Sequence, residues 1–264
     1  MFSRNDMNII FALAGVVIKE LYRRKDFYVL FVLTAVITVA AGSAQFFHDP
    51  NIVGYMKDLC LLLIWISALL ITIATTARQI PAERESRTIF PLLAKPVTRG
   101  QVILGKFFGC WLASGAALAV FYLFFAVITG SREHYWPVLN YLQAFLLQWV
   151  MLGIVTAMTL LGSVFFSAPS VTITILFVAV AGILCFGGHL NTIALHNSEP
   201  TRTIIYTIYF MIPHLELFDV RERLVNDWPL VSWLVCGLAA LYAAAYTGLF
   251  LLLTWLAFRR KTLT

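Results

Sequence analysis

Charge is scarce in this sequence. Only 12% of its 264 residues are Asp, Glu, Lys or Arg, while 61% are hydrophobic. A soluble domain carries about twice that share of charge, so this chain is not built to face water on all sides. The formal net charge of +6 does not indicate nucleic-acid binding, because the basic residues fall between apolar runs, as charges at a membrane surface do. The sequence therefore predicts an integral membrane protein.

Motifs for metal binding, redox chemistry and catalysis are also lacking. The four cysteines form no CxxC pair and no Cys/His zinc spacing, and we expect them to be small buried hydrophobes: Cys60, Cys110, Cys185 and Cys236. No GxxxxGK[ST] phosphate loop occurs, so the chain does not bind ATP by that route. Intramembrane enzymes need paired carboxylates, a histidine cluster or a nucleophile with its base, and the apolar runs hold none of these. We predict no catalytic residue, metal or cofactor in this chain.

Six apolar segments reach or approach the roughly twenty residues that a helix needs to cross the hydrocarbon core. They are Phe27–Phe47, Leu59–Ala77, Leu104–Ile128, Tyr141–Phe166, Val171–Gly188 and Leu230–Phe258. An uncharged turn at residues 167–170 joins the fourth and fifth. A further apolar stretch, Thr203–Pro213, is too short to span and is expected to be re-entrant or interfacial. We predict one all-α transmembrane domain over residues 1–264.

The distribution of basic residues supports six spans with both termini in the cytoplasm. Under this topology the cytoplasmic stretches hold five acidic residues and 14 of the 19 basic ones: Arg4, Lys19, Arg23, Arg24, Lys25, Arg78, Arg84, Arg87, Lys95, Arg99, Lys106, Arg259, Arg260 and Lys261. A seventh span would place the terminal basic cluster outside, against the positive-inside rule. We therefore expect a multi-pass protein of the inner (plasma) membrane.

The first 26 residues are predicted to lie on the cytoplasmic surface. Nothing there resembles a cleaved signal peptide. From Asn8 to Arg24, apolar residues recur at helical spacing, which predicts an amphipathic interface helix: Ile9, Ile10, Leu13, Val16, Val17 and Leu21. The alternative is a soluble N-terminal helix.

The longest cytoplasmic loop, residues 78–103, contains a predicted short helix and a helix start. Pro81 suits a first helical turn, and Glu83 and Glu85 follow where the helix dipole favours negative charge. Thr98 and Gln101 match a capping box at the start of the third span. Such a helix can present charges to a cytoplasmic partner; alternatively, the loop only fixes the topology.

The loop resembles the signature of a known family. The residues that carry the resemblance are Glu83, Arg84, Glu85, Thr88, Leu92, Leu93, Pro96, Val97, Arg99, Leu104, Gly105 and Lys106, with weaker matches at Lys19, Glu20, Arg23, Pro213, Glu216, Phe218, Asp219, Phe258, Arg259 and Arg260. In order and spacing they are similar to the type-2 permeases of ATP-binding-cassette exporters. Arg87 stands where that family usually has Gly, and Pro91 interrupts the short helix.

The resemblance implies the membrane subunit of an ATP-driven transporter. A second permease chain, in a homodimer, and two separate ATPase subunits that bind the ATP are its implied partners. The implied coupling helix is Pro81–Leu93, and the implied ATPase-subunit interface is Glu83, Arg84, Glu85, Arg87 and Thr88. Movement of this helix would open a pathway at the dimer seam. The alternative is a non-transporting scaffold, or a metal- or haem-handling protein of a periplasmic maturation machine.

The remaining predictions concern the outer side of the membrane and the middles of the spans. All five histidines fall there without tight ligand spacing: His48, His134, His189, His196 and His214. Within the outer segment 189–229, Leu215–Trp228 is expected to form a solvated helix or a docking surface for an extracytoplasmic partner. The middles of the spans contain no ionisable side chain, so the energy for transport is expected to come from another subunit. A seam of this kind favours a hydrophobic or amphiphilic cargo, or mechanical force without cargo.

Overall fold

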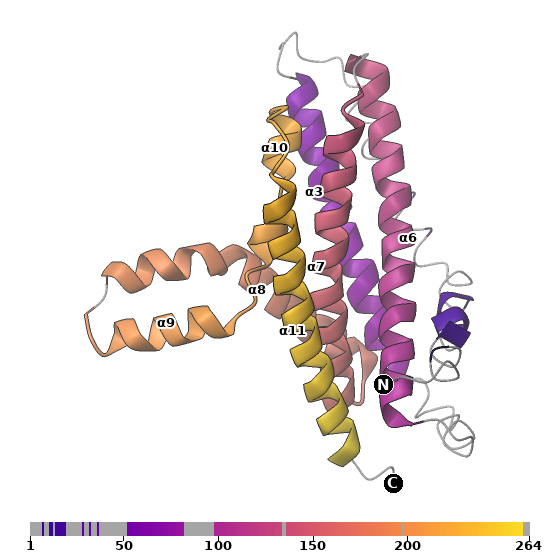
Figure 1. The fold of residues 1–264 in the computed structure, drawn as a ribbon, viewed down its shortest axis with the longest axis vertical. Coiled ribbons are helices and arrows are strands. Elements are labelled where there is room, and N and C mark those ends of the chain that lie inside the picture. Colours follow the sequence, from indigo (N-terminus) through magenta and orange to yellow (C-terminus); the bar gives the residue numbers. More distant parts are fainter. Residues whose placement is uncertain are drawn as a thin grey trace.

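The fold is a bundle of long helices with a side hairpin (Figure 1). The computed structural model describes residues 7, 11–12, 14–19, 28, 32, 36, 52–81, 98–133, 136–196 and 198–260, and these include no strand. Its elements are α3 (Ile52–Ala77), α6 (Arg99–Glu133), α7 (Val138–Phe165), α8 (Pro169–His196), α9 (Thr201–Met211), the 3₁₀ turn η1 (Leu215–Phe218), α10 (Arg221–Val225) and α11 (Trp233–Arg260). In Figure 1, α3, α6, α7 and α11 stand upright, while α9 and the end of α8 project sideways.

Four of the described helices are long and apolar enough to cross a membrane: Gly54–Pro81, Arg99–Ser131, Val138–Phe165 and Trp233–Arg259. They correspond to the second, third, fourth and sixth expected spans. The fifth lies in α8, whose apolar stretch Pro169–Cys185 is shorter than a usual span. The first, Phe27–Phe47, lies outside the described residues apart from 28, 32 and 36. The described part of the chain thus supports four of the six spans.

Helix α7 is the centre of the bundle. It packs against α3, α6, α8 and α11, and Met151, Leu152 and Val155 on it are fully buried. Between membrane helices, packing and interhelical hydrogen bonds replace the hydrophobic effect as the source of association. By contrast, α11 lies at the edge of the bundle, and its Leu234 and Leu241 side chains are 70% and 68% exposed.

Two tryptophans join α6 to α7 by a reciprocal pair of hydrogen bonds. The indole N–H of Trp111 donates to the carbonyl of Trp149 at 2.9 Å, and the indole N–H of Trp149 donates to the carbonyl of Trp111 at 3.1 Å. The rings stack with centroids 4.7 Å apart. Gly115 and Gly153 make room, since a Cβ atom at either position would meet the opposite indole. Small residues of this kind allow helices to approach closely.

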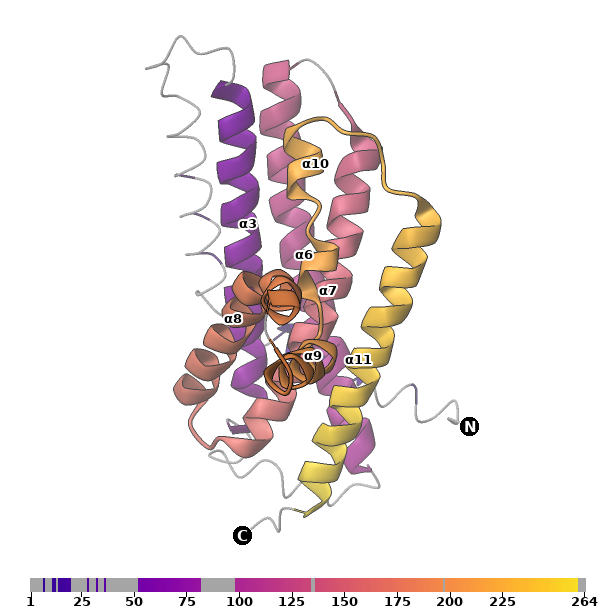
Figure 2. The same cartoon turned by 90° about the vertical axis from the view of Figure 1, so that its left-hand side faces the viewer.

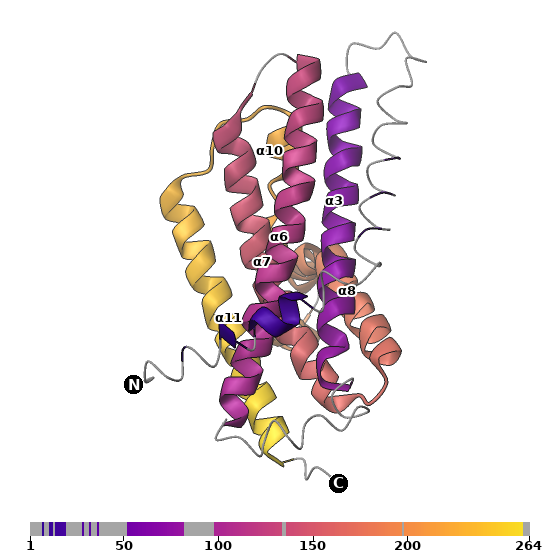
Figure 3. The ribbon, with the colours of Figure 1, turned by 90° about the vertical axis from the view of Figure 1, so that its right-hand side faces the viewer.

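The N-terminal segment packs across the lower part of α6 (Figure 3). Residues 14–19 are helical, and Ala14 and Val17 are buried while Val16 is 65% exposed. Val17 contacts Cys110, and a Cβ atom on Gly109 would lie 2.7 Å from Val17 Cβ. Residues 14–19 are therefore helical and lie on α6 through Ala14 and Val17, and the amphipathic helix expected over Asn8–Arg24 stays a prediction.

The chain between α9 and α11 differs from the expected solvated outer helix. We call residues 213–232 the strap. It contains η1 and α10 as separate short pieces, and Leu215, Phe218 and Leu224 in them are buried. The strap runs upward along the bundle and then crosses to α11 (Figure 2). The expectation was wrong because these three apolar residues pack against α3, α7 and α8, leaving the charged residues between them to face the bundle or water.

The side hairpin corrects a second expectation. His189 and His196, which we placed in the outer segment after the fifth expected span, both belong to α8. The short apolar stretch Thr203–Pro213 forms a helix of its own, α9, that ends at Met211 before Pro213. As expected from the sequence, α9 is too short to span a membrane: it has eleven residues, about half of the number that a span needs.

Substitution of Gly109 by Leu is expected to displace the N-terminal helix, because the new side chain would overlap Val17 and the backbone of Ala14. The measurement is the labelling of Cys110, which is fully buried, by a membrane-permeant maleimide in a C60A/C185A/C236S background. We expect labelling to be about tenfold faster or more. Gly248→Leu is the control, because nothing lies within 4 Å of a Cβ atom there. Equal labelling in both variants would contradict the docking of this helix on α6.

Candidate functional site at the basic end of the bundle

The predicted ATPase interface connects α3 to α6 at one end of the bundle. Glu83, Arg84, Glu85, Arg87 and Thr88 lie outside the described residues, as do all of residues 82–97. The described chain stops at Pro81 and resumes at Thr98. We call this end, which carries Arg78, Arg99 and Arg259, the basic end. The described residues at this end are those that flank the loop and hold its two ends.

The start of α6 has the predicted capping box. The backbone N–H of Thr98 donates to Gln101 Oε1 at 2.8 Å, and the N–H of Gln101 donates to Thr98 Oγ1 at 3.4 Å. The first amides of a helix have no partner within it, and this exchange satisfies two of them. The prediction from Thr98 and Gln101 is confirmed, and it fixes where the loop ends and α6 begins.

Lys106 ties α6 to the end of α3. Its ammonium group donates to the backbone carbonyl of Gln79 at 2.9 Å, and Lys106 and Gln79 are only 5% and 4% exposed. Gln79 follows the end of α3 at Ala77, and a buried cation is favourable beside a backbone carbonyl that it can bond. The two ends of the loop are therefore joined through a buried charge-assisted bond, which is stronger than a neutral one.

Arg99 ties α6 to the end of α11 in the same way. Its guanidinium donates to the carbonyls of Phe258 and Arg259 at 3.0 and 3.3 Å. It also lies over the Phe258 ring, 5.7 Å from the centroid. Arg99, Phe258 and Arg259 are all among the residues that carried the family resemblance, and the fold brings them together from positions about 160 residues apart.

We call Gln79, Arg99, Lys106 and Phe258 the collar. In the collar, cations on α6 bond a backbone carbonyl just after α3 and backbone carbonyls at the end of α11. A force applied to the loop reaches α3 directly through the chain at Pro81 and α6 directly through Thr98. Through Arg99 it also reaches α11. This arrangement can transmit movement of one loop to three membrane helices; it offers no nucleophile or acid–base pair.

Comparison with known families identifies the chain. A family model described as "ABC-2 family transporter protein" matches residues 9–263, nearly the whole chain. The chain belongs to this ABC-2 family. The type-2 permease resemblance of the loop is thereby confirmed, and the chain is a membrane subunit of an ABC transporter. ABC-2 proteins are the membrane component and not the ATPase, so an ABC ATPase is the general partner. No curated protein matches the chain closely enough to add a relative to this finding.

Sequence reasoning missed a polar contact at the opposite end of the bundle. Lys57, which we placed in an outer connection, lies in α3 and is 2% exposed. Its ammonium group lies 3.2 Å from both carboxylate oxygens of Asp227 in the strap. A lysine near the start of a long apolar helix was the available signal, since a buried lysine side chain needs a partner. Among the described residues, no group of three or more His, Cys, Asp or Glu side chains could hold a metal ion.

Lys106→Met is expected to lower the stability of the bundle. The variant keeps most of the side-chain volume but leaves the buried Gln79 carbonyl without the ammonium group, at a cost of about 1–3 kcal/mol. For a chain of this length that is a fall of several degrees in apparent Tm in detergent, at about 2–4 °C per kcal/mol. Lys19→Met is the matched control, because Lys19 is exposed. If both variants melt together, the collar does not contribute to stability.

Proposed function

We propose that this ABC-2 subunit couples ATP hydrolysis by a separate cytoplasmic ATPase to export or to conformational work across the membrane. The collar is the observation that carries the proposal. It links both ends of one cytoplasmic loop, and the end of the last helix, through charge-assisted bonds to buried or half-buried groups. A loop that only determined the orientation of the chain in the membrane would not need hydrogen bonds that hold its two ends to neighbouring helices.

The loop itself is the proposed contact with the ATPase. Residues Pro81–Leu93 form the coupling helix, and Glu83, Arg84, Glu85, Arg87 and Thr88 are the side chains that face the partner. Charged residues on such a surface suit a polar, reversible interface more than a permanent apolar one. The N-terminal helix, seated on α6 near Gly109, offers a second surface on the same side.

The proposed cycle begins when two ATPase subunits close on ATP, which they alone bind. Closure pushes the coupling helix, and the collar passes the displacement to α3, α6 and α11. Two copies of the chain form the permease as a homodimer in the inner membrane, with both termini in the cytoplasm. The displacement tilts α3 and α6 and opens a path at the seam of the dimer. The energy is supplied by the ATPase, in agreement with the absence of ionisable side chains from the middles of the expected spans.

The Glu83→Ala/Arg84→Ala double variant is expected to lose its ATPase partner or its control over it. The tagged chain is purified from its native membrane in mild detergent, and its co-purifying proteins are identified and assayed for ATP hydrolysis. We expect a Walker-motif ATPase at about equal stoichiometry with the unchanged chain. With the double variant we expect about tenfold less co-purified activity, the loss of roughly 1.4 kcal/mol of interface energy.

Glu199→Ala/Arg202→Ala is the matched control, because it removes the same residue types from two exposed positions, one in the turn before α9 and one in its first turn. Its ATPase recovery is expected to equal that of the unchanged chain. Full recovery with the Glu83/Arg84 variant, or the purification of the chain without any ATPase, would refute the proposed coupling.

A further inference from the structure

Helix α11 turns a leucine-rich face away from the bundle. Its most apolar stretch is only 6% buried inside the chain, against 44–67% for the other three described spans. In the lower half of the helix, Leu249, Leu252 and Leu256 are 50%, 61% and 44% exposed. We call these three residues the leucine stripe, because their spacing places them on one face of the helix. In a membrane, a stripe of large apolar side chains is a surface for acyl chains.

The leucine stripe ends at an aromatic residue and an arginine. Trp255 and Arg259 follow Leu252 by three and seven residues, so they continue the same face of α11. Both are exposed, and the Arg259 guanidinium lies over the Trp255 ring, 5.7 Å from one of its ring centroids. Tryptophan and arginine at the end of a membrane helix are typical of the headgroup region. The face therefore runs from the depth of acyl chains to the depth of lipid headgroups.

Arg99 adds a second guanidinium from α6. It donates to the backbone carbonyl of Arg259 at 3.3 Å, where the lower ends of α6 and α11 lie side by side (Figure 3). Within the described part of the chain, neither guanidinium forms an ion pair with a carboxylate. Two neighbouring cations without a counter-ion repel each other. An anion bound between them would remove that repulsion.

The indole of Trp255 places a neutral donor in the same seam. A Cβ atom on Gly100 of α6 would lie 3.8 Å from both Cδ1 and Nε1 of Trp255, so this edge of the indole faces α6. The indole N–H has no hydrogen-bond acceptor among the described residues. A phosphate group suits this set of donors, because its oxygens accept hydrogen bonds from guanidinium and N–H groups at the same time.

We propose that the lower seam between α6 and α11 binds an anionic glycerophospholipid. Its phosphate lies between Arg99, Arg259 and Trp255, and its acyl chains lie along the leucine stripe. The lipid stays bound and is not the transported cargo. Bound there, its phosphate joins α6 to α11 beside the collar contact of Arg99. The site requires only that the basic end lies at a membrane surface, and it does not rest on the proposed coupling to an ATPase.

A second copy of the chain fits this face less well than a lipid does. Two copies in one membrane have the same orientation, so a twofold contact through this face would bring their two Arg259 side chains together. Contacts between membrane helices also use small residues that let the backbones approach closely, whereas the stripe consists of leucine. The charge and the size of these side chains both favour lipid.

Native mass spectrometry of the tagged full chain in mild detergent tests the site. The chain is titrated with phosphatidylglycerol and, separately, with phosphatidylcholine of the same acyl chains, and the Kd of each lipid is measured. Arg259→Gln removes one exposed guanidinium but keeps the backbone carbonyl that Arg99 bonds. We expect the unchanged chain to prefer the anionic lipid about tenfold or more, and this preference to fall about fivefold in Arg259→Gln.

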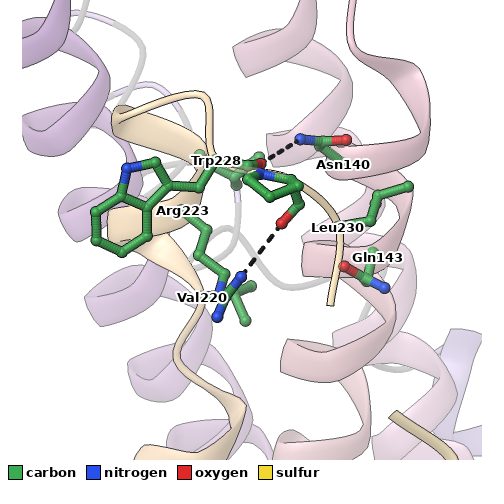
Figure 4. A pocket seen from close by; sticks show the side chains of 8 residues that line it. Asn140, Gln143, Val220, Arg223, Trp228 and Leu230 are labelled. Atoms are coloured by element: carbon green, nitrogen blue, oxygen red, sulfur yellow. Dashed lines mark hydrogen bonds between the residues drawn. The ribbon is translucent and has the colours of Figure 1, made fainter. Parts of the chain in front are cut away.

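Arg223→Gln is the matched control. Arg223 is also exposed, and its guanidinium also donates to a backbone carbonyl, that of Pro229 at 3.2 Å, but at the opposite end of the bundle (Figure 4). The hollow beside it has a volume of about 10 Å³, room for about one water molecule and not for a headgroup. The lipid preference of this variant is expected to equal that of the unchanged chain.

Three results would overturn the proposal. The first is an unchanged chain that does not prefer the anionic lipid. The second is an equal fall in Arg259→Gln and Arg223→Gln, which would mean that total charge and not this seam attracts the lipid. The third is displacement of the bound lipid by an excess of soluble glycerol phosphate, which would indicate a site for free phosphate, since that molecule has no acyl chains for the stripe. The assay contains no ATPase, so its failure is distinguishable from a failure of the proposed coupling.

Discussion

The bond from Lys106 to the Gln79 carbonyl is the interaction on which the arrangement of this ABC-2 subunit depends. A backbone carbonyl that is buried needs a hydrogen-bond donor within the protein. Here the partner is a buried ammonium group on the next helix of the bundle. This bond joins the two ends of the sixteen-residue connection between Pro81 and Thr98, in addition to the packing of α3 against α6. The residues on either side of the connection are therefore held together by a hydrogen bond.

A lysine makes a polar contact at each end of α3, but the two contacts differ in their exposure to water. Lys106 holds the lower end by a backbone carbonyl, in a contact that is buried on both sides. At the upper end, Lys57 on α3 itself meets a carboxylate that is half open to water. From Gln79 to Lys57 the helix is about 33 Å long at 1.5 Å per residue. The two lysine contacts therefore attach opposite ends of this segment, the first to a buried carbonyl and the second to a partly exposed carboxylate.

The sequence predicted the features that depend on residues close together along the chain. The capping box of Thr98 and Gln101, the turn between α7 and α8 and four of the expected spans were readable from local pattern. The strap was not, because its burial depends on partners far away in sequence: Asp227 finds Lys57 across 170 positions. Charge density in the strap indicated solvent, and the three apolar residues that determine its place are too few to form a periodic pattern. The ATPase-facing residues stay a prediction.

The reciprocal tryptophan pair has a consequence for how this family member can change over evolutionary time. Each indole fills the gap left by a glycine on the facing helix and binds the carbonyl of the other tryptophan. Loss of one ring would empty a gap, free a carbonyl and unpair the second ring at once. Trp111, Gly115, Trp149 and Gly153 thus form one packing unit, and we expect the four positions to covary in homologous chains.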